Sequence, residues 1–130
     1  MFKKLLFLIT LSISHVSLSA DFFWIGSTGD WSDTLHWSAT SGGVSVGNFL
    51  PTSADNVIFD NNSGLTGVGS IVTMDSAVVV NNFDYSAVPG AFTFASVLAS
   101  IEIQGSFASN GLANYTWLGD FNFNSTTVGN

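Results

Sequence analysis

The 130-residue chain contains no cysteine and only two prolines. The missing cysteine excludes disulfide bonds and thiolate metal sites, so apolar burial and backbone hydrogen bonds must hold the folded state together. A single domain of this size is marginally stable by those means alone, which favours an architecture with dense β pairing. No linker or low-complexity tract divides the chain, so we expect one domain.

Positive charge is also nearly absent. The two basic residues, Lys3 and Lys4, precede an apolar run at residues 5–11, and small residues follow at Ser17, Ser19 and Ala20. This order predicts a signal peptide over residues 1–20, because the run is too short to span a bilayer. We expect cleavage after Ala20, or after Ser19 with Ser17 behind it, and a secreted or outer-cell-surface protein without membrane insertion.

The segment after Ala20 contains all nine acidic residues and no Lys or Arg. Such a segment repels nucleic acid and anionic membranes, so neither is expected as a partner. Pectate-lyase and phosphate chemistry need cations that are missing here. Only His36 remains as a histidine, and no Gly-x-Ser-x-Gly surrounds a serine, so a nucleophilic triad is not expected either. These absences predict a protein that is not an enzyme.

No window after the leader carries a helical stripe, whereas short apolar runs with period two recur from Val57 onward. They consist of β-branched and aromatic residues, and Gly, Asn and Pro-Gly turns separate them. Two all-β architectures fit this pattern, a parallel β-helix or solenoid and an antiparallel β-sandwich.

A weak internal repeat favours the solenoid. Residues 79–84, 103–108 and 117–122 share one frame, which runs apolar, any, Gly or Asn, polar, Phe, any. Gly and Asn enter the left-handed region of the backbone easily, so the third position predicts a corner where the chain bends. The spacings of 24 and 14 residues are unequal, so each coil is expected to have more than one such corner.

The stretch from Trp24 to Asp60 fits neither a helix nor an alternating strand, and it holds three of the four tryptophans. Solenoids need an atypical cap over their first coil. We therefore predict an irregular N-terminal cap over residues 21–60 and coils over residues 61–130 that are incomplete at the C-terminal end, in a longer native chain. The residues expected to build the cap are Gly26, Asp30, Trp31, Asp33, His36 and Trp37.

A resemblance accompanies this stretch. Its pattern is Trp24-x-Gly26-x-x-Gly29-Asp30-Trp31-Ser32-Asp33-x-x-His36-Trp37-Ser38, then Ser41-Gly42-Gly43, Pro51-Thr52 and Asp55-Asn56-Val57-Ile58-Phe59-Asp60. It resembles the N-terminal region of large exported adhesin-like repeat proteins of Bacteroidetes-type bacteria, which are cargo of type IX secretion, and it is similar to β-helix units of autotransporter passengers. The resemblance implies a right-handed parallel β-helix at the cell surface, with adhesion as its function and no shared catalytic motif.

Two kinds of ligand site can be considered within the stretch. Exposed tryptophan rings stack on sugars, which makes Trp24, Trp31 and Trp37 candidates, although packing is the commoner role for such rings. Calcium takes oxygen ligands only, and four neighbouring oxygen donors could supply them: Asp55, Asp60, Asn61 and Asn62. No calcium-binding loop motif is present, and zinc is not expected with one histidine and no cysteine. No other cofactor is expected.

The sequence therefore predicts an exported, non-catalytic, adhesin-like structural segment with a glycan or a surface protein as its partner. Two alternatives remain open. One is a carbohydrate-binding β-sandwich module, which would expose two or more coplanar tryptophans. The other is a fragment of a polysaccharide-active β-helix enzyme, which would hold two carboxylates in one cleft.

Overall fold

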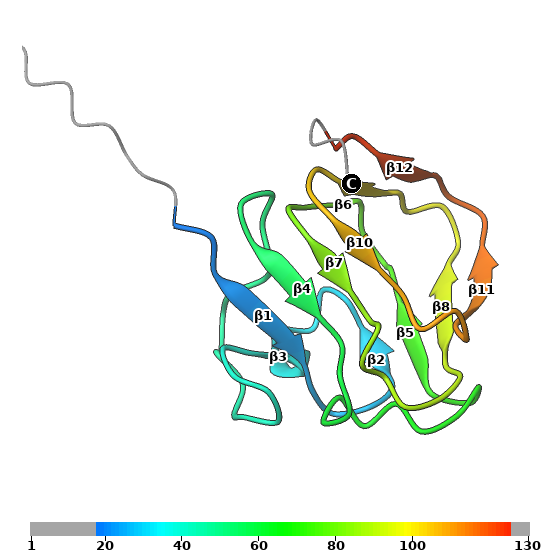
Figure 1. Cartoon of the computed structure of the whole chain (residues 1–130), viewed down its shortest axis with the longest axis horizontal. Helices are drawn as coiled ribbons and strands as arrows, with labels where there is room; N and C mark the ends of the chain where they lie inside the picture. The colour runs from blue at the N-terminus through cyan, green and yellow to red at the C-terminus, as the bar shows by residue number, and fades with distance from the viewer. Residues whose placement is uncertain (1–17, 126–130) are drawn as a thin grey trace, which may run out of the picture.

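The computed structural model describes residues 18–125, and it is an all-β solenoid (Figure 1). Three successive coils each contribute one strand to each of three parallel sheets. Their strands are β4 (Asn56–Ile58), β5 (Ile71–Thr73) and β6 (Val78–Val80) in the first coil, β7 (Phe83–Asp84), β8 (Thr93–Ser96) and β9 (Ile101–Ile103) in the second, and β10 (Phe107–Ala108), β11 (Asn114–Trp117) and β12 (Phe121–Phe123) in the third.

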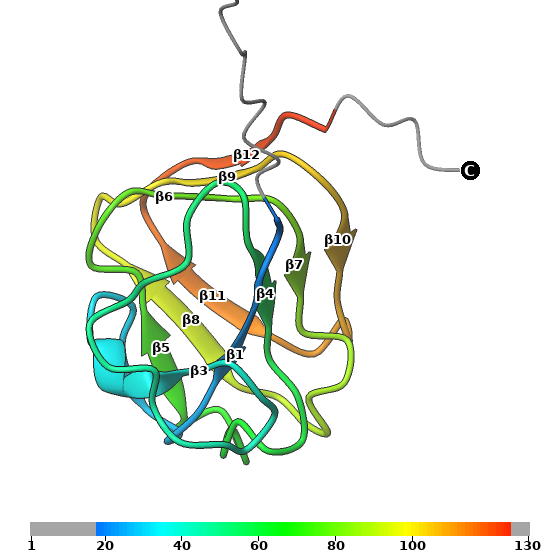
Figure 2. The same cartoon turned by 90° about the vertical axis from the view of Figure 1, so that its left-hand side faces the viewer.

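The strands of successive coils lie in register. Phe83 pairs with Val57 on one side and with Phe107 on the other, and Ile101 pairs in the same way with Val78 and Phe121. Figure 2 looks along the stack and shows the three sheets as three sides of one tube. The predicted parallel solenoid is confirmed. The sandwich alternative is wrong, because β1 and β3 form the one antiparallel strand pair among the described residues.

The repeat frame marks true corners. Residues 81–82 and 104–106 form the same corner in successive coils, between β6 and β7 and between β9 and β10. The third copy of the frame lies at a different corner, between β11 and β12, which explains the unequal spacings. The predicted left-handed backbone is wrong, however, since neither Gly105 nor Gly119 has a positive φ. Glycine is needed there for close stacking, because a Cβ on Gly105 would lie 2.2 Å from Asn82 Oδ1.

Aromatic rings fill the interior of the tube. Phe59, Phe83 and Phe94 are each at most 1 % exposed and contact one another with centroid distances of 5.4–5.7 Å. The same core continues toward the N-terminus through Trp24, whose ring lies 5.6 Å from that of Phe59. The alternation of buried and exposed residues in strands such as β6, whose ends are buried and whose centre is exposed, places the apolar side chains inward.

The N-terminal part forms a partial coil that turns back on itself. It contains β1 (Asp21–Trp24), β2 (Gly29–Asp30), a 3₁₀ helix η1 (Thr34–His36) and β3 (Trp37–Ser38). β1 lies parallel to β4, and β2 lies parallel to β5. β3 then pairs antiparallel with β1, so one sheet gains two strands at this end and a second sheet gains one. β4, which falls within the stretch predicted as cap, forms the first strand of the first complete coil.

The predicted signal peptide falls mostly outside the described residues, which begin at Leu18. Within residues 18–125, no helix has the length and apolar character needed to cross a membrane.

Candidate functional site

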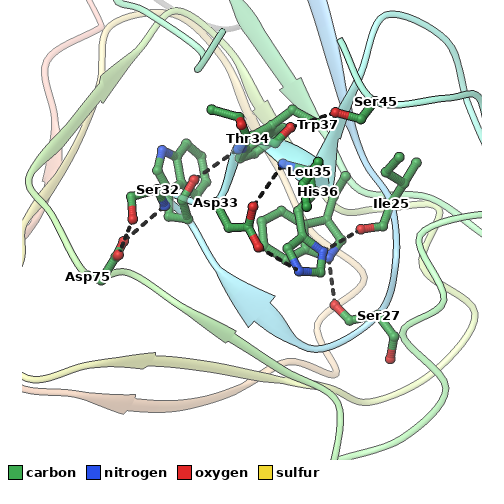
Figure 3. Close-up of polar contacts among 12 residues, drawn as sticks. Ile25, Ser27, Ser32, Asp33, Thr34, Leu35, His36, Trp37, Ser45 and Asp75 are labelled. Atoms are coloured by element: carbon green, nitrogen blue, oxygen red, sulfur yellow. Dashed lines mark hydrogen bonds and ion pairs between the residues drawn. The ribbon is translucent and has the colours of Figure 1, made fainter. Parts of the chain in front are cut away.

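His36, the one histidine after the predicted leader, lies in a socket formed by the N-terminal cap (Figure 3). Its imidazole stacks on Trp24 with a centroid distance of 4.6 Å and an interplanar angle of 9°. Nδ1 lies 2.7 Å from the carbonyl oxygen of Ile25, so this nitrogen carries the proton and donates it. Nε2 lies 3.8 Å from Asp33 Oδ2. Both ring nitrogens therefore lie near oxygen atoms of the cap itself.

Two glycines make room for the histidine ring. A Cβ on Gly29 would lie 2.0 Å from His36 Nε2, and a Cβ on Gly26 would lie 3.1 Å from Nδ1. Gly26 also has a φ of +88°, which L side chains rarely adopt. The spacing of Trp24, Gly26, Gly29 and His36 is thus explained by one packing arrangement, in which the ring lies against the tryptophan and the two glycines.

Asp30, Asp33 and the two remaining cap tryptophans lie in the same unit. Asp33 caps η1 by accepting a hydrogen bond from the Leu35 amide at 2.9 Å, and its own amide donates to the Asp30 carbonyl oxygen at 3.1 Å. Trp37 Nε1 donates to the Trp31 carbonyl oxygen at 2.9 Å. These contacts tie the cap residues to one another.

The three tryptophans considered as sugar ligands are buried. Trp24, Trp31 and Trp37 are at most 2 % exposed, and their rings pack edge to face on one another with centroid distances of 5.1 and 4.6 Å. Their faces are covered by neighbouring side chains, so no sugar can stack on them in this arrangement.

The four oxygen donors considered for calcium are divided by β4. Asp55 precedes the strand and Asp60 follows it, so the two carboxylates are separated by roughly 15 Å of extended chain. Asp60 Oδ1 accepts the Asn62 amide at 2.8 Å, and Asn62 Nδ2 donates to Ser41 Oγ at 2.8 Å. Nowhere in residues 18–125 do three His, Asp or Glu side chains gather closely enough to hold a metal ion.

Asp75, which sequence reasoning did not single out, joins the cap to the first coil. It accepts hydrogen bonds from the amide and from the hydroxyl of Ser32, the former at 3.0 Å (Figure 3). The two residues are 43 positions apart, and no local pattern connects them.

A polar ladder runs along the corner that precedes β4, β7 and β10. Asn56 Nδ2 donates to Asp21 at 2.7 Å, and Asn82 Nδ2 donates to Asn56 Oδ1 at 2.7 Å. Asn82 Oδ1 then accepts the Ser106 amide at 2.6 Å and the Ser106 hydroxyl at 2.9 Å. The Asn81-Asn82 pair in the repeat frame was the available signal for this ladder.

The C-terminal end of the coil stack carries an apolar hollow of about 360 Å³, which we call the terminal hollow. Five aromatic side chains line it, and they are Phe107, Tyr115, Trp117, Phe121 and Phe123. The equivalent positions in the second coil, such as Phe94 and Ile103, are fully covered by the third coil, whereas Tyr115 is 47 % and Phe123 is 58 % exposed. The regular alternation that predicted these strands did not show that the rings would be uncovered.

The hydroxyl groups of Tyr85 and Tyr115 share a hydrogen bond between the second and third coils. Burial, followed by this hydrogen bond and by the neighbouring Tyr85 hydroxyl's charge, raises the pKa of Tyr115 above its usual range. Tyr115 therefore keeps its phenolic proton at physiological pH.

Residues 18–125 thus form a β-solenoid whose N-terminal part turns back on itself. Comparison of the chain with protein-family models, with curated proteins and with solved structures found no match.

Proposed function

We propose that this chain is an exported, adhesin-like structural protein of the bacterial cell surface, without catalytic activity. The observation that supports the proposal is that the cap and the coils play different structural roles. The cap uses its tryptophans and its histidine for packing, whereas the coils stack as a tube whose outward positions carry both polar and apolar side chains. Repeats stacked in this way give an extended binding surface with little conformational freedom.

The surface offered to a partner is neutral to acidic. Sheet strands β6, β9 and β12 place Val79, Glu102 and Asn122 in one outward column, and Lys and Arg are absent after residue 4. Such a surface binds by hydrogen bonds and apolar contact, with no electrostatic attraction to an anion. A neutral glycan or a surface protein is the matching partner, in agreement with the resemblance of the cap sequence.

Within residues 18–125, the packing of the one histidine supports a non-catalytic role. His36 donates from Nδ1 to a backbone carbonyl, and its side chain is 15 % exposed. A general base must reach the substrate proton within hydrogen-bonding distance, which this packing prevents.

A second candidate function is sugar binding by aromatic stacking, and the terminal hollow favours it. Its rings are partly exposed, unlike those of the cap, and rings of this kind can stack on the apolar face of a sugar. In this candidate the ligand binds in the terminal hollow, whereas in the first candidate the partner binds along the outward faces of the coils.

One experiment separates these functions. The full chain is produced in an exporting bacterium, its location is followed by fractionation and by protease treatment of whole cells, and the exported protein is applied to an array of neutral glycans and immobilised surface proteins. We expect surface location and binding that survives Trp117→Ala. Binding lost in Trp117→Ala but kept in the exposed control Leu118→Ala would establish the second candidate, while retention in the cytoplasm would contradict both.

A further inference from the structure

We propose that maturation cleaves the bond between Ser19 and Ala20, and that the new α-ammonium group of Ala20 binds the carboxylate of Asp55. The inference rests on the proposed export of the chain. It assigns both a processing site and a structural role for the processed end.

Asp55 is a nearly buried carboxylate, 8 % exposed, with a polar partner on each oxygen. Oδ2 accepts the Thr52 amide at 2.9 Å and the Thr52 hydroxyl at 2.7 Å. Oδ1 accepts the Ala20 amide at 3.1 Å. A buried carboxylate is costly without such donors, and a positively charged donor satisfies it better than a neutral amide.

Ala20 belongs to the folded unit through its backbone. β1 and β4 pair Asp21 with Asn56, so Ala20 and Asp55 occupy the next register position. The Ala20 carbonyl oxygen accepts the Asn56 amide at 2.8 Å, while its own amide donates to Asp55. Cleavage after Ala20 would remove both hydrogen bonds, whereas cleavage after Ser19 preserves both.

The bond between Ser19 and Ala20 also suits a leader peptidase. Residues 18–20 are exposed and have no regular secondary structure, so the bond is accessible. Cleavage there places Ser17 and Ser19 at the third and first positions before the cut, where small residues are required. Cleavage one residue later would place the large Leu18 at the third position.

The chemistry is hydrolysis. Water adds across the peptide bond, Ser19 leaves with a carboxylate, and the nitrogen of Ala20 becomes a protonated amine. Because Lys3 and Lys4 leave with the leader, the processed chain has no Lys or Arg, and this amine is its only primary amine. Among the nine acidic side chains, Asp55 holds this amine, because Asp55 is buried and already accepts a hydrogen bond from the Ala20 nitrogen.

The first test is the identity of the mature N-terminus. The full chain is expressed in an exporting bacterium, and the exported product is analysed by intact mass and N-terminal sequencing. We expect residues 20–130. A product that begins at Asp21 would overturn the inference while leaving export intact, and a product that keeps the leader would overturn both.

The second test uses the single amine. Acetic anhydride acetylates the Ala20 nitrogen and removes its charge, and hydroxylamine then removes acetyl groups from the tyrosine hydroxyls. Urea unfolding is compared for the acetylated and free forms after the same hydroxylamine treatment. We expect acetylation to raise the unfolding equilibrium constant roughly threefold to tenfold, the size of effect typical of a partly buried charge-assisted hydrogen bond. The effect should fall below about twofold in Asp55→Asn and stay unchanged in the matched control Asp60→Asn.

Equal effects of acetylation in Asp55→Asn and in the unsubstituted chain would contradict the pairing. If Asp55→Asn does not fold, the rate at which the Ala20 amine of the unsubstituted chain is acetylated tests the pairing instead. An amine paired with Asp55 should react about tenfold more slowly in the folded chain than in urea, because the pair retains the proton, and equal rates would overturn the assignment.

Discussion

A histidine ring held between a tryptophan face and two glycines explains why this chain places Trp24, Gly26, Gly29 and His36 at their particular spacing. At the scale of single residues, His36 lies three positions after Asp33, and its Nε2 is 3.8 Å from Asp33 Oδ2. The contacts show that the ring fills space and donates to a backbone carbonyl. The two glycines leave room for the histidine ring, and the tryptophan provides the face on which that ring stacks.

This arrangement makes the Cβ position of Gly29 the most sensitive point of the cap. In Gly29→Ala the added methyl group would lie 2.0 Å from His36 Nε2, so the ring must move off Trp24. We expect a loss of about 1–3 kcal/mol in the free energy of unfolding, as overpacked sites show. Urea unfolding followed by tryptophan fluorescence measures both the loss and the altered stacking.

Gly69→Ala is the control for this substitution. Nothing lies within 4 Å of a Cβ at Gly69, and its φ is outside the left-handed region, so a change of less than about 0.5 kcal/mol is expected. Equal losses at the two glycines would show that the socket is not the reason for Gly29.

At the scale of elements, the corners hold the coils in register. The strands contain only two to four residues, so few ladder hydrogen bonds fix each of them. The side-chain ladder through Asn56, Asn82 and Ser106 adds bonds that form only when the three corners are aligned. A one-residue slip would break these bonds and turn the core residues outward.

The ladder predicts that Asn82 contributes much more to the free energy of unfolding than other asparagines of the coils do. Asn82→Ala leaves the Ser106 amide without its partner and removes one of the two donors to Asn56 Oδ1, the other being Asn81 Nδ2, which should lower the free energy of unfolding by about 1–3 kcal/mol. Asn122→Ala, on the exposed face of β12, should change it by less than about 0.5 kcal/mol. Thermal or urea unfolding of the two variants provides the comparison, and similar values for both would argue against the ladder.

At the scale of the whole molecule, Tyr115, whose hydroxyl shares a hydrogen bond with that of Tyr85, is expected to make stability depend on pH. The raised pKa of Tyr115 means that the folded chain keeps this proton at a pH where the unfolded chain, with a tyrosine pKa of about 10, has lost it. The contribution is therefore complete below pH 10 and is lost progressively as the pH rises above 10.

Unfolding curves collected from pH 8 to pH 11.5 should show stability falling over the upper part of this range. Tyr115→Phe should flatten that fall, because position 115 then has no proton to lose. Absorbance at 295 nm reports tyrosine ionisation in parallel. A slope that is unchanged in Tyr115→Phe would refute the role of this residue.

The coil architecture was predictable because its signals are local. Period-two runs such as Ile101 to Ile103 mark strands, and the recurrence of Phe83 and Phe107 after 24 residues marks a coil. The conformation of Gly105 was not predictable, because close stacking and a positive φ both select glycine. The link between Ser32 and Asp75 depends on which coils meet in space, and sequence spacing does not reveal it.

Burial of the cap tryptophans was only partly predictable. Turn-bounded spacing favoured packing over sugar stacking, but it did not show that Phe59 and Phe83 would complete the enclosure. The uncovered rings of the terminal hollow were missed for the related reason that Tyr115 and Phe123 carry the same inward pattern as buried residues.

The cap also determines how the tube behaves toward other tubes. Coils stacked without a cap would have free strand edges and apolar interiors at both ends, and the two ends would complement each other, so copies could add head to tail into an open fibre. Here β1 and β2 already occupy the N-terminal edges of two sheets, and β3 folds back antiparallel over β1. Because β3 runs antiparallel to the coil strands, it disfavours parallel addition of another copy at this sheet, and we expect removal of the cap to produce fibres before it produces unfolding.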